Sequence, residues 1–289
     1  MAQKDLPYQL ITDHIVALLE AGTVPWHRPW DAAVGAPRNL VSTHPYRGVN
    51  VFVLGSQRFT SPWWLSFPKQ VNDLGGRLRA GEKVSYVVFW KPLERTQAHE
   101  DGTEDTRRIP LLRYYKVVNA LQCTGITTPE ASETAPREHA PLAACAALVA
   151  TMPQRPTLHH GHTQASYWPR EDAVYLPNPE RFESPEAYYS TLYHELTHAT
   201  GHASRLNRAT LKDMVRFGDT NYSREELVAE MGAAFLCGVT GIAHTTIANS
   251  VSYLDGWLRA LRADTKLLVI AAAQAQRAAD CIRGVLSPE

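Results

Sequence analysis

The sequence predicts an α+β protein of two domains, a mixed α/β domain over residues 1–128 and a mainly helical domain with a small sheet over residues 140–289. Short runs of β-branched and aromatic residues favour strands in the first half, whereas apolar residues recur at helical spacing through most of the second. Five of the seven Trp residues precede residue 91, so the halves also differ in composition. Residues 129–139 are polar, contain two Pro residues and show no apolar period, which predicts a linker.

The overall composition narrows the class of protein. The 289 residues include 29 Lys or Arg and 29 Asp or Glu, and a net charge of zero argues against a polybasic or an acidic disordered chain. A hydrophobic fraction of 44% fits a globular protein with a buried core. No apolar run approaches the roughly 20 residues of a membrane helix, and the first residues lack an apolar signal core. Together with four widely spaced Cys residues, these features favour a cytoplasmic protein without a membrane partner.

The first domain should open with a helix over residues 6–19, where apolar residues recur at helical spacing. Asp5 is placed to cap this helix, Pro7 suits its first turn, and Gly22 ends it. An irregular Pro- and Trp-rich segment should follow at residues 25–37, and a short helix at residues 69–74. Two strands are expected at residues 84–90 and 111–118, with an exposed, charged hairpin loop between them at residues 94–108.

The second domain should contain a few short strands within residues 157–176, and helices elsewhere. Ser184 followed by Pro185 is typical of a helix N-terminus. The helices expected are residues 140–151, 185–202, 224–238, 245–262 and 264–284.

The sharpest functional signal is His194-Glu195-Leu196-Thr197-His198. Two His residues at positions i and i+4 share one face of a helix, so both imidazoles can bind one ion. A Glu directly after the first His is placed to act as a general base on a water molecule at that ion. The pattern therefore predicts a catalytic metal site, the alternative being two solvated His residues on a surface helix. We expect one divalent metal, with Zn²⁺ favoured and Mn²⁺ or Co²⁺ compatible with the same donors.

A catalytic zinc ion usually takes three protein ligands, so the third must come from elsewhere in the chain. Glu226 and Glu230 share a face of the helix expected over residues 224–238. We expect Glu226 to bind the metal and Glu230 to hold a ligating His by a hydrogen bond, with the reverse assignment as the alternative.

Two further residues near the motif are candidates for supporting roles. His202 lies one turn beyond His198 and about 40° further around the helix, too distant to join the same ion easily. We expect it to cap the helix or to orient a ligand. Tyr222 precedes the helix of Glu226 and is a candidate donor of a hydrogen bond to an oxyanion, the alternative being a packing role.

The segments around these residues resemble a known family. Residues 189–202, 204–208 and 224–230 are similar to the zincin-like metallopeptidase domain of the ArdC family of antirestriction proteins. The family more often has Trp at the position of Ala199, a difference that lies beside the ligands and leaves them intact.

The first domain resembles the same family through independent segments, namely residues 19–26, 29–30, 45–50, 74–77, 81–83 and 118–126. Cys123, in the segment 118–126, is an unusual residue for this family. The similarity extends from about residue 8 to residue 238, which is most of the chain. In that family the N-terminal domain binds single-stranded DNA, so the resemblance implies the same partner here.

The charge distribution is compatible with that partner. Residues 1–93 contain ten Lys or Arg and six Asp or Glu, a balance of +4, whereas residues 131–289 contain fourteen and seventeen, a balance of −3. Binding single strands requires cations for phosphates and aromatic rings for stacking. The alternative is that each Trp fills the core and the cations are solvated. The candidate DNA-binding residues are Trp26, Trp30, Arg47, Asn50, Trp63, Lys69, Arg77 and Lys83.

The resemblance implies a plasmid-type antirestriction protein that protects incoming DNA during conjugation. Whether it hydrolyses a restriction-related protein substrate stays open. The competing hypothesis is a non-catalytic single-strand-binding decoy whose metal is structural. Four protein ligands would favour the decoy, and three ligands with an open position would favour a peptidase.

Overall fold

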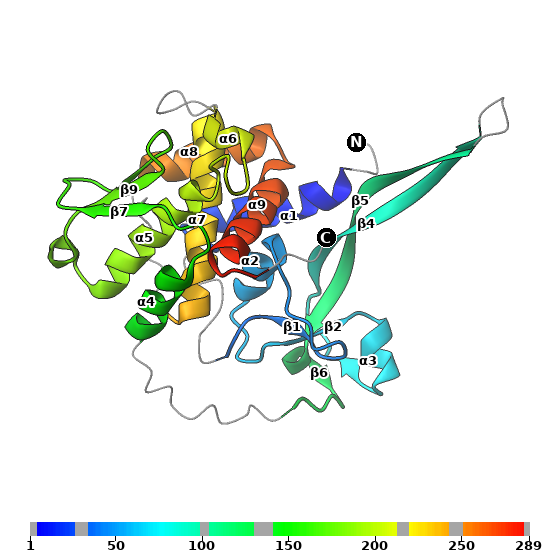
Figure 1. Cartoon of the computed structure of the whole chain (residues 1–289). Coiled ribbons are helices and arrows are strands. Elements are labelled where there is room, and N and C mark those ends of the chain that lie inside the picture. The colour runs from blue at the N-terminus through cyan, green and yellow to red at the C-terminus, as the bar shows by residue number, and fades with distance from the viewer. Residues whose placement is uncertain are drawn as a thin grey trace.

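The structure is a computed structural model of the whole chain, and it describes residues 5–26, 34–98, 104–129, 141–212, 220–242 and 251–285 (Figure 1). Helices and three sheets occur within these ranges, as the α+β prediction requires. Trp30 and residues 130–139 of the expected linker lie outside the described residues, so the domain boundary stays a prediction.

The first part of the chain forms a four-stranded sheet of order β1-β2-β5-β4. Strands β1 and β2 are parallel, whereas β5 pairs antiparallel with both β2 and β4. Strands β3 and β6 form a separate antiparallel pair. The elements are α1 (Leu6–Glu20), β1 (Arg38–Asn39), α2 (Val49–Gly55), β2 (Trp63–Ser66), α3 (Lys69–Asp73), β3 (Arg77–Leu78), β4 (Ser85–Ala98), β5 (Glu104–Asn119), a 3₁₀ turn (Ala120–Gln122) and β6 (Cys123–Thr124).

One feature of this part differs from the prediction, and one helix was not predicted. The sequence predicts a loop at residues 94–108, but β4 and β5 stay paired out to Ala98 and Glu104 and project as an arm (Figure 1). The hydrogen bonds of a two-stranded ribbon join main-chain atoms and require no apolar side chains. The sequence of such a ribbon can therefore be as charged as that of a loop. Helix α2 has no predicted counterpart, and its Val-rich sequence has the propensity of a strand. Burial of most of its residues overrides that propensity.

The second part packs helices around a small sheet of order β7-β9-β8, in which β8 is antiparallel to β9. The helices predicted for this part are confirmed where the structure describes them, although the helix from Pro185 ends three residues earlier than expected and the last helix begins three residues later. Residues 140 and 245–250 of the predicted helices lie outside the described residues. No described helix is long and apolar enough to cross a membrane. The elements are α4 (Pro141–Thr151), β7 (Thr157–His160), β8 (Ser166–Trp168), β9 (Ala173–Leu176), a 3₁₀ turn (Pro179–Arg181), α5 (Pro185–Ala199), α6 (Ala209–Lys212), α7 (Thr220–Thr240), α8 (Val251–Ala263) and α9 (Leu267–Ile282).

The main apolar core joins the two parts of the chain, because α1 and α2 lie against α7, α8 and α9 (Figure 1). Phe52 of α2 stacks on Phe235 of α7, with ring centroids 4.7 Å apart. Trp26 packs edge-on between Phe52 and Trp257 of α8. The N-terminal part therefore rests directly on α7, the helix that carries Glu226.

Candidate metal centre

Helix α5 brings His194, Glu195 and His198 into the interior. As predicted, the helix begins after Ser184, whose hydroxyl accepts a backbone N–H of the first turn at 3.1 Å. The spacing of four residues sets the two imidazoles side by side, with their Nε2 atoms 3.1 Å apart. Each of the three residues is only 5% exposed, so the three side chains are buried together.

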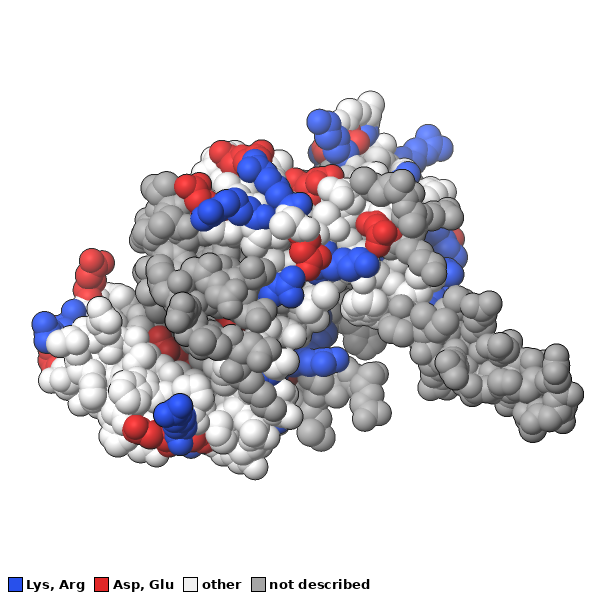
Figure 2. Space-filling view, turned by 90° about the horizontal axis from the view of Figure 1, so that it is seen from above, with Lys and Arg blue, Asp and Glu red and all other residues white. Residues whose placement is uncertain are grey.

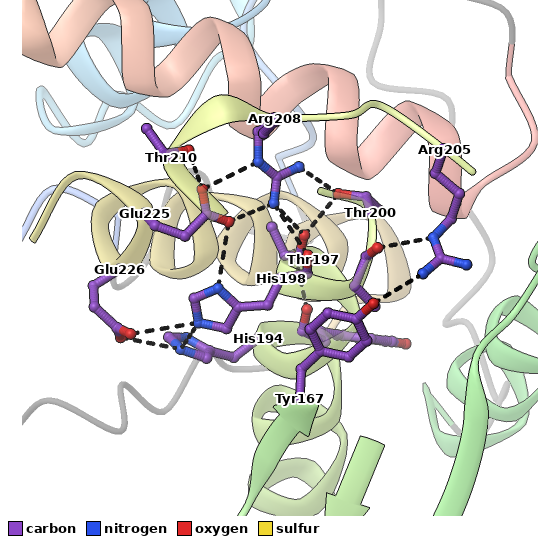
Figure 3. Close-up of polar contacts among 12 residues, drawn as sticks. Tyr167, His194, Thr197, His198, Thr200, Arg205, Arg208, Thr210, Glu225 and Glu226 are labelled. Atoms are coloured by element: carbon purple, nitrogen blue, oxygen red, sulfur yellow. Dashed lines mark hydrogen bonds and ion pairs between the residues drawn. The ribbon is translucent and has the colours of Figure 1, made fainter. Parts of the chain in front are cut away.

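Glu226 of α7 completes a three-residue donor set (Figure 3). Its Oε2 lies 3.4 Å from His194 Nε2, and its Oε1 lies 3.5 Å from His198 Nε2. One donor atom from each residue falls within 4.8 Å of the others. Two imidazole nitrogens and a carboxylate that face one point are a typical donor set for a catalytic zinc ion, so these residues fit a divalent cation.

The electrostatics of the site also suit a cation. Burial by itself lowers the pKa of His194, but Glu226, Glu230 and Glu195 raise it to about 9. The surrounding carboxylates therefore favour positive charge at the centre. A divalent ion can supply this charge in place of a proton.

The outer nitrogen of each imidazole faces its own carboxylate. Glu230 Oε1 lies 3.6 Å from His194 Nδ1, within ion-pair range but beyond hydrogen-bond distance, so the predicted hydrogen bond from Glu230 stays a prediction. Glu225 Oε1 lies 3.4 Å from His198 Nδ1. A carboxylate at Nδ1 sets the orientation of the ring and leaves Nε2 free for a metal.

Glu225 is held in turn by Arg208 (Figure 3). Arg208 Nη2 donates to Glu225 Oε1 at 2.5 Å, Nε donates to Oε2 at 3.2 Å, and the Thr210 hydroxyl also donates to this carboxylate. Burial raises the pKa of Glu225, but hydrogen bonds from His198 and Arg208 lower it to about 2, so the group stays ionised. This pair is not predictable from the sequence, since a contact between residues 17 apart leaves no local pattern.

Gly232 allows α5 and α7 to approach closely. A Cβ atom at this position would lie 2.5 Å from Cγ2 of Thr197, which is much closer than real side chains come. Thr197 lies directly before His198, and Gly232 follows Glu230 by two residues. The missing side chain therefore helps to bring the donors of the two helices within reach of one another.

Glu195 lies beside the edge strand β8. Its carboxylate accepts a hydrogen bond from the main chain of Tyr167. Burial raises the pKa of Glu195, whereas the charges on His194 and His198 lower it, and the net direction is upward. A raised pKa suits a carboxylate that must first take up a proton and then release it.

Arg205 fixes strand β8 against the end of α5. Its Nε donates to the carbonyl of Ala199 at 2.8 Å, and its guanidinium pairs with Asp172. Asp172 also accepts the hydroxyl of Tyr167 at 2.8 Å. One buried guanidinium thus links the strand beside Glu195 to the helix that carries it.

The structure describes the surroundings of His202, whose expected role as a cap or an orienting residue stays a prediction. It lies beyond the end of α5, and its Nδ1 is 2.8 Å from the hydroxyl of Ser204. No contact of His202 with His194 or His198 occurs among the described interactions, because the chain has left the helical path. Tyr222 lies in α7, but its side chain is outside the described part, so its role stays a prediction.

Three of the expected DNA-binding residues have structural partners instead. Trp26 is fully buried, and Asn50 is 4% exposed with its amide bonded to the N–H and carbonyl of Val88, both at 2.8 Å. Neither can reach a nucleotide, which corrects the prediction. Arg47 pairs with Asp280, a buried residue of α9.

Four others lie at or near the surface. Trp63 is half-buried, with the guanidinium of Arg38 5.6 Å from its ring. Lys69 pairs with Asp73 at 2.5 Å on the exposed face of α3. Arg77 and Lys83 are exposed. No aromatic platform forms among the expected tryptophans that the structure describes.

Comparison with known proteins identifies both parts of the chain. Residues 5–118 match the family model of the N-terminal domain of anti-restriction factor ArdC. Residues 146–274 match a family model described as a zincin-like metallopeptidase. The second match contains all of His194, Glu195, His198 and Glu226.

Two curated proteins show the extent of the similarity. An uncharacterized protein y4eC of Sinorhizobium fredii is 33% identical over 287 residues, which are 94% of this chain and 90% of that protein. DNA primase TraC of Escherichia coli is 32% identical over 98% of this chain, but the chain spans only 27% of the length of TraC.

Two solved structures share the whole fold. The metal-free crystal structure of the antirestriction protein ArdC from the R388 plasmid is 35% identical, with a TM-score of 0.74 and coverage of 97% of this chain and 99% of that one. The Mn(II)-bound structure of ArdC gives a TM-score of 0.73, with coverage of 96% and 97%. The chain therefore belongs to the ArdC family of antirestriction proteins.

Proposed function

We propose that this protein is a plasmid-type antirestriction factor that acts in the cytoplasm, binds single-stranded DNA through its N-terminal part and hydrolyses a protein substrate at its metal centre. The observation that carries the peptidase assignment is the convergence of His194, His198 and Glu226 on one point, with Glu195 buried beside it. Family membership supports the antirestriction role and the DNA partner.

The chemistry of this chain's own residues follows from that arrangement. A divalent ion held by the two Nε2 atoms and Glu226 would supply a Lewis acid that polarises the scissile carbonyl. Glu195 takes a proton from the attacking water and passes it to the leaving amine. The hydrogen bond from the main chain of Tyr167 keeps its carboxylate in place during both transfers.

Strand β8 is the element on which a peptide substrate would bind. In the described part of the sheet, β8 pairs with β9 on one side and forms an edge on the other. An extended peptide can add to such an edge through main-chain hydrogen bonds. Because Tyr167 belongs to this strand, a peptide bound there would pass close to Glu195.

The positions of Glu230 and His202 argue against a closed structural site. Glu230 faces Nδ1 of His194, on the side away from the donor atoms Nε2. His202 bonds to Ser204. Three donors therefore converge among the described residues, which supports a site with an open position.

The decisive experiment is Glu195→Ala, with bound metal, proteolysis and protection from restriction measured on the same preparation. The proposal expects metal to remain, and both proteolysis and protection to be lost. Full protection by a metal-loaded Glu195→Ala protein would show that peptide hydrolysis is not the mechanism. Metal analysis of the purified protein would decide between Zn²⁺ and Mn²⁺.

A further inference from the structure

One face of the β4–β5 hairpin, beyond the buried Val87 and Val117, carries two exposed aromatic rings. Phe89 and Tyr115 are 44% and 40% exposed, although each has a large apolar surface to bury. Their ring centroids are 5.8 Å apart. Tyr46, itself buried, packs against Phe89 with a centroid separation of 6.1 Å, so one ring of the pair is supported from the protein side.

The strand register places cations on the same face. Phe89 is opposite Arg113, and Lys91 follows Phe89 by two residues, so Lys91 points to the same side. Both cations are exposed, and neither forms an ion pair with a carboxylate among the described residues. The hairpin stretches 85–93 and 109–119 contain no Asp or Glu. The result is a strip in which rings and positive charges alternate.

The face of the molecule seen from above offers no extended positive area to a polyanion. Figure 2 shows blue and red side chains interspersed over this face, without an extended area of one sign. On this face, attraction of a phosphate chain would therefore be local. Side chains that combine stacking surface with positive charge are what a single strand with exposed bases requires.

We propose that Phe89, Lys91, Arg113 and Tyr115 form the platform on which the bases of single-stranded DNA stack, with Lys91 and Arg113 contacting the phosphates. This inference rests on the proposed single-strand binding and moves its location from the tryptophans to the hairpin. The bases would lie on the exposed faces of the two rings, and the strand would run across the ribbon.

The hairpin supplies its own matched controls. Tyr114 is 39% exposed and adjacent to Tyr115, but strand alternation places it on the opposite face. Lys116 is exposed, three residues from Arg113, and likewise on the opposite face. A variant on each face therefore removes the same chemistry from nearly the same place.

The test measures the anisotropy of a fluorescent 20-nucleotide oligothymidine with the full-length protein at low salt. We expect the Phe89→Ala/Tyr115→Ala protein to bind about ten-fold or more weakly, and Tyr114→Ala to stay within about two-fold of the unmodified protein. Arg113→Glu should weaken binding more than Lys116→Glu, and Tyr115→Phe should bind like the unmodified protein because it keeps the ring. The charge variants leave the aromatic packing untouched, so they decide the matter even if the double alanine variant unfolds.

Other outcomes would overturn the inference in distinguishable ways. If the unmodified protein binds the oligonucleotide and the platform variants bind equally well, the location is wrong while the proposed function stands. Equal losses from variants on both faces would also exclude this face. Equal affinity for a duplex of the same length would exclude stacking as the mode of binding. Failure of the unmodified protein to bind at low salt would remove the single-strand assignment itself.

Discussion

Glu225 and His198 meet across the interface of α5 and α7, with Oε1 of the carboxylate 3.4 Å from Nδ1 of the imidazole. Arg208 occupies the other side of the same carboxylate. The ring that presents Nε2 to the metal centre is thus oriented by a buried ion pair. Glu226, the next residue along α7, supplies a donor directly. One turn of the helix therefore carries both a metal donor and the carboxylate that orients His198.

Glu225→Gln should weaken metal affinity by about 10- to 100-fold, because the amide orients His198 less firmly than a carboxylate does. Competition against a fluorescent chelator measures this affinity. Glu183→Gln, an exposed residue shortly before α5, is the control and should leave it unchanged. Unchanged affinity in the Glu225 variant would mean that the contact with His198 has no orienting role.

Arg208→Met should lower the free energy of unfolding by about 3–5 kcal/mol, since it leaves the carboxylate of Glu225 buried without its cation. Denaturant titration provides the value. Arg224→Met is the matched control, because Arg224 pairs with Asp264 at 3.1 Å with both side chains more than one-third exposed. That surface pair should contribute no more than about 1 kcal/mol. Similar losses in both variants would contradict a special role for the buried pair.

Gly232→Ala should destabilise the protein by about 1–3 kcal/mol and weaken metal binding, because the added Cβ forces α7 away from Thr197. Adding Thr197→Ala should recover part of the loss by removing Cγ2. Gly256→Ala in α8 is the control, since no atom lies within 4 Å of the added carbon, and it should be neutral or stabilising by up to about 1 kcal/mol. Thermal melts with and without metal would separate the effects on stability and on the site.

The Arg205–Asp172 pair should make the stability of the protein depend on pH in the acidic range. Hydrogen bonding to Arg205 lowers the pKa of Asp172 below its ordinary value. A depressed pKa in the folded state contributes stability that is present above the unfolded pKa of about 3.9 and is lost as the pH falls through the folded value. The difference in Tm between the unmodified protein and Asp172→Asn should therefore be largest near neutral pH and narrow below about pH 4. A difference that does not change between pH 7 and pH 3 would exclude this linkage, and Asp255→Asn in α8 provides a reference curve.

Local periodicity makes several features predictable from the sequence alone. Ser184 and Pro185 mark the start of α5 because capping depends on neighbouring residues. The spacing of His194 and His198 fixes their common face because a helix repeats every 3.6 residues. The same rule predicts that Glu226 and Glu230 share one face of their helix. These properties need no knowledge of how the helices pack.

The tertiary structure alone decided which atoms these residues present to one another. Glu226 reaches the Nε2 side of the imidazoles and Glu230 the Nδ1 side, while Glu225 finds Arg208 across a turn of the chain. Packing likewise buried Trp26 and left Phe89 and Tyr115 exposed, although composition favours the Trp residues as stacking surfaces. The physical reason is that helix phase and capping arise within a few residues, whereas contacts between elements depend on the packing of the whole core.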